Sequence, residues 1–265
     1  MAIDTLQKVV DALPGQSYAI VKATVSLPAA GRVTHLWTYA GFPPAGAAPS
    51  SGMAGDVPTA TTTGAFPLKN PASGSSYIGK LTAGCEATGT LHVYDRLWHH
   101  SGIAVATTTA QTVNSVALTR PDALGADVEA WFDIYATTGA GAATPTIVYT
   151  DQDGTAAQTG TVLGYLASSV AGRTFPISLA AGDTGVRSIQ SITLGVSLTS
   201  GTVGLVLRRR LASIGIPAAN QRYTLSAIEA GMAGIPNSAC LEFLYTVQVS
   251  LTGPPLCGEM SIIQG

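Results

Sequence analysis

The most telling property of the sequence is its shortage of charge. Asp, Glu, Lys and Arg together make up 11% of the 265 residues, whereas an average soluble domain has about 25%. A surface with so few charges has little electrostatic protection against self-association. We therefore expect much of it to be covered by further copies of the chain or by a larger assembly, which favours a structural protein over an enzyme.

The sequence also lacks an excess of positive charge. Its formal net charge is −2 and its pI is about 6.0, which argues against binding to nucleic acid or to acidic membranes. No apolar run reaches the roughly 20 residues that a membrane-spanning helix needs. Residues Met1–Pro14 carry Asp4, Lys8 and Asp11, so they do not read as a signal peptide, and we expect synthesis in a cytoplasm.

Cysteine is scarce. Cys85, Cys240 and Cys257 are too few and too scattered for a disulfide framework. The sequence contains no CxxC pair, which excludes a zinc ribbon. Reduced thiols are favoured in a cytoplasm. A disulfide between Cys240 and Cys257 stays open as the alternative.

Motifs of catalysis and of nucleotide binding are absent. The sequence contains no GxSxG elbow, no GxxxxGK[ST] loop and no GxGxxG fingerprint. Glu129 and Asp133 share one face of a predicted strand, and a glycosidase-like pair of carboxylates is the less favoured interpretation of them. We predict that the chain is not an enzyme and binds no cofactor.

Two segments contain residue types that bind metals. His99 and His100 are adjacent on a predicted strand and point to opposite faces, which disfavours a shared metal ion. Residues 151–154 (DQDG) begin like a calcium loop, but the twelfth position of that loop is Val162 instead of Glu. A hairpin turn is the favoured interpretation, and we predict no metal site.

The periodicity predicts an all-β fold with one helix. Residues 3–13 place apolar side chains at helical spacing. Short runs that alternate between two faces follow, of which 128–136 is an example, and turn residues separate them. Residues 151–154 and 199–201 are predicted to turn hairpins. We predict a β-sandwich of jelly-roll-like type over residues 81–265.

The first 80 residues are predicted to form a short N-terminal helix and a long extended arm. Residues 42–76 are rich in Pro, Gly, Ala, Ser and Thr and have almost no charge. The stretch is too long for an ordinary connection. A mobile loop is one interpretation, and an arm that lies across a partner and orders on assembly is the other. The low charge favours the arm.

Three consecutive arginines, Arg208–Arg210, follow the apolar run GLVL. Side chains alternate along a strand, so at least one arginine must point toward a packed side and needs a carboxylate or carbonyl partner there. The cluster could contact another protein of an assembly or could end a strand in solvent, and both interpretations stay open.

Three segments carry a resemblance to a known group of proteins. They are YDRLWHHSGI (94–103), TTTAQTVNSVALTRP (107–121) and AGDTGVRSIQSITLGVSLTSGTVGLVLRRRL (181–211). These segments resemble virion structural proteins of tailed bacteriophages. The resemblance implies a head-associated protein of the phage particle that is made in the bacterial cytoplasm. By itself it does not distinguish a decoration protein on the capsid surface from a vertex, collar or tail component. It implies no catalytic residues. The long helix of a major capsid protein is missing, so the shell subunit itself is not expected.

We therefore expect a capsid decoration, or cement, protein that binds and stabilises the assembled head. Its expected partners are the major capsid protein and copies of itself in a homotrimer. The candidate interface residues lie on the helix and in the arginine cluster: Ile3, Leu6, Val9, Val10, Arg208, Arg209 and Arg210.

The alternative is a tail, vertex or fibre protein with a receptor- or glycan-binding role. That alternative predicts aromatic side chains exposed in a shallow groove. Trp37, Trp98 and Trp131 are the candidates for this role.

Overall fold

The computed structural model describes residues 3, 5–13, 15–23, 25–27, 30–71, 74–120, 124–253 and 255–265. These residues form eighteen β-strands and one short α-helix, which confirms the all-β prediction. Asp4 and Pro14, which entered the sequence argument, lie outside the described residues. No helix in the described part of the chain is long and apolar enough to cross a membrane.

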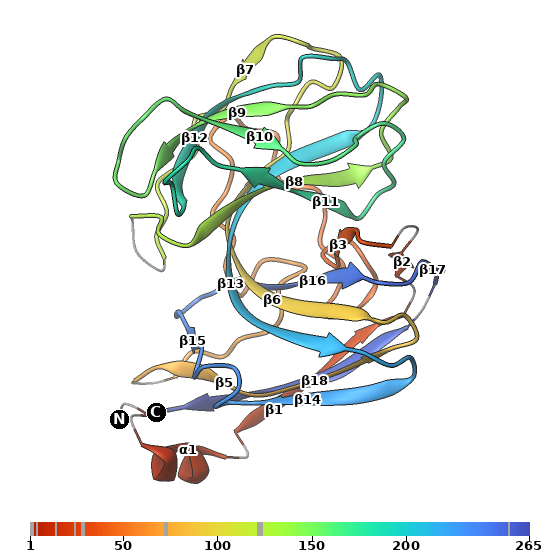
Figure 1. Ribbon diagram of the computed structural model, residues 1–265. Helices are drawn as coiled ribbons and strands as arrows, with labels where there is room; N and C mark the ends of the chain where they lie inside the picture. The colour runs from red at the N-terminus through yellow and green to blue at the C-terminus, as the bar shows by residue number, and fades with distance from the viewer. Residues whose placement is uncertain are drawn as a thin grey trace. The chain divides into compact units, whose positions relative to one another are not determined.

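The chain divides into two compact units. Unit 1 comprises Met1–Gly46, Thr59–Asp95 and Leu211–Gly265, and unit 2 comprises Ala47–Pro58 and Arg96–Arg210. Two long strands, β6 (Gly89–His100) and β13 (Thr202–Ile216), contribute residues to both units (Figure 1). The boundary expected between residues 80 and 81 falls inside the strand β5 (Ser76–Cys85), and the compact units divide the chain elsewhere.

Unit 1 contains two main sheets. The first consists of β5 with β1 (Gln16–Lys22), β4 (Gly41–Phe42), β14 (Gln221–Ser226), β15 (Gly234–Ile235) and β18 (Leu256–Gln264). Its strand order is β14-β5-β18-β1-β4, and β15 also pairs with β5. The second sheet includes β3 (Val33–His35) and β16 (Leu241–Val247), and its order in this unit is β3-β16-β6-β13. A separate pair joins β2 (Ser26–Leu27) to β17 (Leu251–Thr252).

The two sheets of unit 1 share one hydrophobic core. Ile78, Leu81 and Met260 come from the first sheet, and Val93 and Phe243 come from the second; each is at most 1% exposed. A register shift in the β5–β18 pairing lets Ile78 and Leu81, an odd number of residues apart, face the same side. Each sheet therefore buries one face against the other, as strands with one apolar face require.

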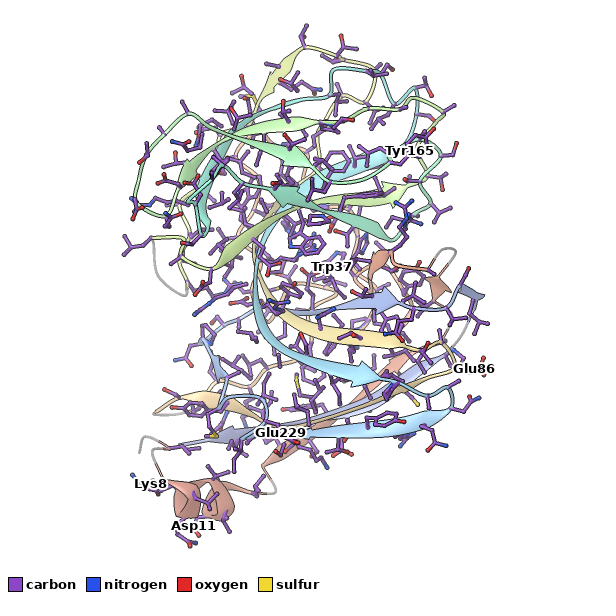
Figure 2. The ribbon with its side chains drawn as sticks, in the orientation of Figure 1. Lys8, Asp11, Trp37, Glu86, Tyr165 and Glu229 are labelled. Atoms are coloured by element: carbon purple, nitrogen blue, oxygen red, sulfur yellow. The ribbon has the colours of Figure 1, made fainter. Side chains whose placement is uncertain are left out.

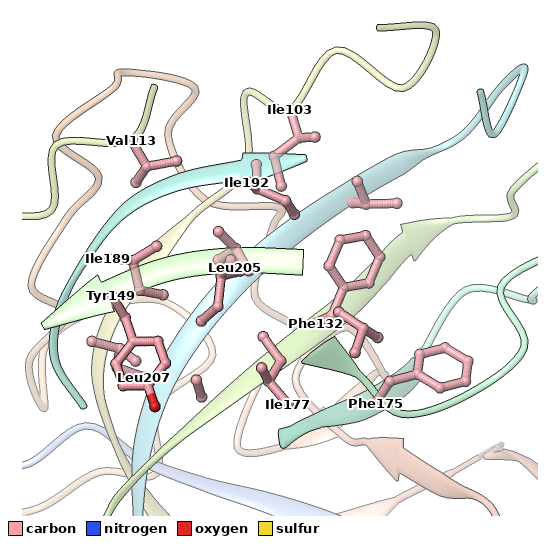
Figure 3. Packing of buried hydrophobic residues seen from close by; sticks show 14 of the residues in the cluster. Ile103, Val113, Phe132, Tyr149, Phe175, Ile177, Ile189, Ile192, Leu205 and Leu207 are labelled. Carbon is pink, nitrogen blue, oxygen red and sulfur yellow. The ribbon is translucent and has the colours of Figure 1, made fainter. Parts of the chain in front are cut away.

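Unit 2 is a second all-β unit with a core of its own. Its strands are β7 (Ala110–Thr112), β8 (Val128–Ala136), β9 (Thr146–Asp151), β10 (Gln158–Val162), β11 (Arg173–Ser178) and β12 (Val186–Thr193). With β13 they form the order β13-β8-β11-β10-β9-β12-β7. Phe132 on β8 and Ile189 on β12 lie far apart in this order yet belong to one buried cluster, so the sheet curls around its core (Figure 3).

One of the two predicted hairpins forms. Strands β9 and β10 pair antiparallel around residues 151–154, and Asp151 Oδ1 accepts hydrogen bonds of 2.8 Å from the N–H groups of Asp153 and Thr155. The hairpin predicted around residues 199–201 is wrong, because β12 pairs with β9 and β7 while β13 pairs with β6 and β8. The Leu198 N–H donates to Val105 at 2.8 Å, which directs this connection to another segment.

The prediction of an extended arm over residues 42–76 is wrong. Within unit 1, Phe66 is fully buried and its N–H donates to the Leu241 carbonyl at 2.8 Å. Its ring packs edge-to-face on Phe243, with the ring centroids 5.7 Å apart. This part of the segment belongs to the core of its own unit.

The part of the segment that belongs to unit 2 is held in a similar way. Asp56 and His99 exchange N–H···O bonds of 2.9 and 3.0 Å, and Trp98 Nε1 donates to the Ala54 carbonyl at 2.9 Å. Parts of the segment are therefore held by their own chain, while other parts, such as Met53 at 62%, stay exposed.

Candidate interaction surfaces

The predicted N-terminal helix is α1 (Leu6–Ala12). It begins after Thr5, whose Oγ1 accepts a hydrogen bond of 3.3 Å from the Lys8 N–H and so satisfies one of the free amides of the first turn. Val9 is 8% exposed and packs on Ala227 and Ile263 of unit 1. The amphipathic helix is confirmed, but Val9 packs on its own chain and is not available to a partner.

An exposed apolar stripe runs along α1 beside Val9. Leu6, Val10 and Leu13 follow one another at intervals of four and three residues, which places them on one side of a helix. Their side chains are 63%, 54% and 43% exposed. We call these three residues the helix stripe. Asp11, also on α1, points away from the strands (Figure 2).

Two cavities flank the helix. One, of about 250 Å³, is lined by Ile3, Thr5, Leu6, Val9, Ile228 and Met232. The other, of about 230 Å³, is lined by Ile3, Lys8, Asp11, Ala12, Gln264 and Gly265. Ile3 is half-buried and lines both. Sequence reasoning missed Ile228, which is 63% exposed and lines the same cavity as Leu6, although Leu225, Ile228 and Met232 follow one another at intervals of three and four residues.

The first arginine of the cluster is fully buried in unit 2. Arg208 pairs with Asp133 at 2.8 Å, and Arg96 pairs with the same carboxylate at 3.4 Å. Thr174 Oγ1 donates to Asp133 at 2.5 Å, and the Arg208 guanidinium lies 5.5 Å from the Trp131 ring centre. The prediction that one arginine points inward to a carboxylate is confirmed. This position removes Arg208 from the candidate interface residues.

The same cluster keeps a histidine neutral. Arg96 Nε donates to His99 Nδ1 at 2.8 Å, so this ring nitrogen carries no proton. Burial first, and then the positive charge of Arg96, lowers the pKa of His99 to about 2. His100 stacks on Trp98 with the rings 3° from parallel. Among the described residues, no three His, Cys, Asp or Glu side chains gather where a metal ion could bind.

The other two arginines line a cleft in unit 2. Arg209 is half-buried and Arg210 is exposed. The cleft has a volume of about 320 Å³ and is lined by Asp127, Glu129, Thr184, Arg209 and Arg210. We call it the polar cleft. The sequence had singled out the carboxylates and the arginines separately, but only the β8–β13 pairing, in which Arg209 lies opposite Val128, brings them together.

The tryptophans do not form an exposed groove. Trp37, Trp98 and Trp131 are 2%, 0% and 7% exposed. Tyr165, in unit 2, is 61% exposed and lies at the surface of that unit (Figure 2).

The cysteines Cys85, Cys240 and Cys257 are all free thiols, and the first two are buried. The structure therefore does not contain the disulfide between Cys240 and Cys257.

Comparison with known proteins finds weak similarity alone. No protein-family model and no curated protein matches the chain. The chain is similar to infectious bursal disease virus VP2 in a subviral particle, with 8% identity over 95% of this chain and 81% of that chain and a TM-score of 0.16. A structure of the Gx strain of the same virus gives 8% identity, the same two coverages and a TM-score of 0.20. At these TM-scores the similarity does not establish a shared fold.

Proposed function

We propose that the chain is a structural protein of a virus particle and that unit 1 is a jelly roll. The strand pairing of unit 1 carries this proposal. Among the described residues, unit 1 has eight strands that are longer than two residues, and in chain order they are β1, β3, β5, β6, β13, β14, β16 and β18. The first pairs with the last, the second with the seventh, the third with the sixth and the fourth with the fifth. Nested pairs spread over two facing sheets describe one long hairpin rolled up, which is the jelly roll of viral capsid and lectin domains.

A fold alone does not determine a function, and the surface chemistry supplies the second support. The chain has 11% charged residues, and its helix stripe leaves Leu6, Val10 and Leu13 exposed. An apolar helix face on a weakly charged protein is typical of a surface that another protein covers.

We infer further that the particle is a tailed bacteriophage and that the chain decorates its head. The three segments that resemble phage virion proteins support this choice. In this role, copies of the chain, as homotrimers, bind the major capsid protein of the assembled head. A ligand that binds only the assembled shell stabilises it by mass action, and several linked contacts make the binding much tighter than one contact alone. This role requires neither catalysis nor a cofactor.

The receptor- or glycan-binding alternative loses its main support. It required exposed tryptophans, whereas Trp37, Trp98 and Trp131 are almost fully buried. No observation on the described residues favours it over the decoration role.

Binding to shells tests the proposal. Heads that lack this protein are mixed with the full chain, sedimented, and analysed for bound chain. Leu6→Ser with Val10→Ser should lower the bound amount at least about tenfold, which corresponds to roughly 1.4 kcal/mol. The matched control is Leu163→Ser in unit 2, because Leu163 is 53% exposed and Leu6 is 63% exposed. Equal binding by wild type and the stripe variant removes the helix from the account, and no binding by wild type contradicts the decoration role.

A further inference from the structure

The polar cleft gathers charge in a protein that has little of it. The whole chain carries 13 basic and 15 acidic residues, and Asp127, Glu129, Arg209 and Arg210 all line this one cleft. Among the described residues, Asp127, Arg209 and Arg210 form no ion pair. The cleft therefore holds two positive and two negative side chains, and three of the four, Asp127, Arg209 and Arg210, are not neutralised by an ion pair with any described residue.

The walls of the cleft are held in place. Glu129 Oε2 accepts a hydrogen bond of 2.9 Å from Trp131 Nε1, and the Trp131 ring is covered by the guanidinium of Arg208. Asp127 has a left-handed backbone with φ of 58°, a conformation that Asp adopts more readily than most residues. The contact with Trp131 fixes the direction of the Glu129 carboxylate before any partner arrives.

The part of the cleft around Thr184 is fixed too. The N–H groups of Thr184 and Gly185 donate to Gln152 Oε1 at 3.0 and 3.1 Å, and Arg187 donates to the Gln152 carbonyl at 2.9 Å. The cleft of about 320 Å³ is roughly ten times the 30 Å³ that one water molecule occupies in the liquid. It therefore has room for the guanidinium group of another chain.

We propose that the polar cleft binds a second copy of itself across a two-fold axis. In such a contact the same patch serves both partners, so every guanidinium of one copy can meet a carboxylate of the other. The patch holds two arginines and two carboxylates, which is the charge balance that such a contact requires. Arg210 is exposed, so its long side chain can reach the partner's carboxylates. A network of several charges contributes more than an isolated surface ion pair does.

This contact goes beyond the proposed function. It concerns copies of the chain alone and requires no shell. In a homotrimer, it would join one trimer to the next and so connect the decorating proteins to each other.

Charge reversal in the full chain tests the proposal. Sedimentation velocity of the wild type at low salt should show a reversible doubling of mass, which weakens at high salt because screening reduces charge attraction. Arg210→Glu and Asp127→Arg should each weaken the doubling by at least about tenfold, since each places like charges face to face. Lys69→Glu is the matched control, because it makes the same charge change at an exposed site of unit 1 and should leave the doubling unchanged.

Mixing the two variants decides the outcome. A chain with Arg210→Glu has a surplus of negative charge in the cleft, and a chain with Asp127→Arg has a surplus of positive charge. An equimolar mixture should therefore restore the doubling that each variant alone has lost. The proposal is overturned if the wild type never doubles, if both variants double like the wild type, or if the mixture stays at the mass of the separate variants.

Discussion

Unit 1 and unit 2 are both built from β-strands, but they bury different chemistry. The core of unit 1 is apolar, and the charged side chains buried beside it are Lys22, Asp95 and Glu242. Lys22 Nζ donates to the carbonyls of Tyr39 and Pro43 at 2.9 and 2.8 Å, and Asp95 Oδ1 accepts a hydrogen bond of 2.9 Å from the Cys240 N–H. Burial lowers the pKa of Lys22 to about 8. Unit 2 buries a carboxylate, Asp133, between two arginines.

The difference indicates how each unit is specified. An apolar core tolerates exchange among side chains of similar volume, whereas a buried ion cluster tolerates only the residues that complete it. In addition to its hydrophobic pattern, unit 2 therefore depends on the residues that complete the ion cluster around Asp133. The following predictions test this contrast, from the largest expected effect to the smallest.

Replacing the central carboxylate of unit 2 should have the largest effect. Asp133→Asn leaves Arg96 and Arg208 buried without their anion, and the free energy of unfolding should fall by about 4–5 kcal/mol. Denaturant titration measures the loss. Adding Arg208→Met should recover part of it, since one uncompensated charge is then removed. A loss below about 1 kcal/mol for Asp133→Asn would show that the ion cluster does not hold unit 2 together.

Removing a core ring of unit 1 should cost nearly as much. Phe66 contacts the rings of Tyr18 and Phe243 at centroid distances of 5.4 and 5.7 Å. Phe66→Ala should lower the free energy of unfolding by about 3–5 kcal/mol. Tyr165→Ala is the control at an exposed position and should stay within about 0.5 kcal/mol. Equal stability of the two variants would mean that residues 42–76 form a free arm after all.

Acid should weaken unit 2 through His99. Its pKa is about 2 in the folded chain and about 6.5 in an unfolded chain, so the unfolded chain takes up a proton that the folded chain rejects. The stabilisation is present above pH 6.5 and is lost as the pH falls below it, by up to about 1.4 kcal/mol per pH unit.

His99→Gln should remove this part of the pH dependence. Thermal unfolding of both proteins should give curves that diverge as the pH falls from about 7 to about 4, because over this range the unfolded histidine becomes protonated while the folded one stays neutral. Parallel curves would contradict a neutral, buried His99.

The smallest effect on stability is expected at the helix stripe. Leu6→Ser should change the free energy of unfolding by no more than about 0.5 kcal/mol, because Leu6 is exposed. Val9→Ala removes two buried methyl groups and should cost about 1–2 kcal/mol. Thermal unfolding distinguishes the two. If Leu6→Ser proved as costly as Val9→Ala, the helix stripe would be packed and unable to bind a shell.

The local pattern of the sequence correctly predicted those features of the fold that depend on residues close together in the chain. The alternation over residues 128–136 became β8, the turn at residues 151–154 formed, and one of the three arginines found a buried carboxylate. Such features follow from side-chain direction and turn chemistry within a few residues.

Features that depend on distant segments could not be predicted in this way. The pairing of β12 with β9 and β7, instead of β13, is decided by tertiary packing. The cover of Phe66 by Phe243 is a contact across 177 positions of the chain. The polar cleft joins residues that are more than 80 positions apart, such as Asp127 and Arg210.

The position and copy number of the chain in whole particles test the central claim most directly. Cryo-electron microscopy of virions should show the chain in many symmetric copies over the outside of the head, with α1 against the shell. A few copies at a single vertex or on the tail, or none in the particle, would contradict the account.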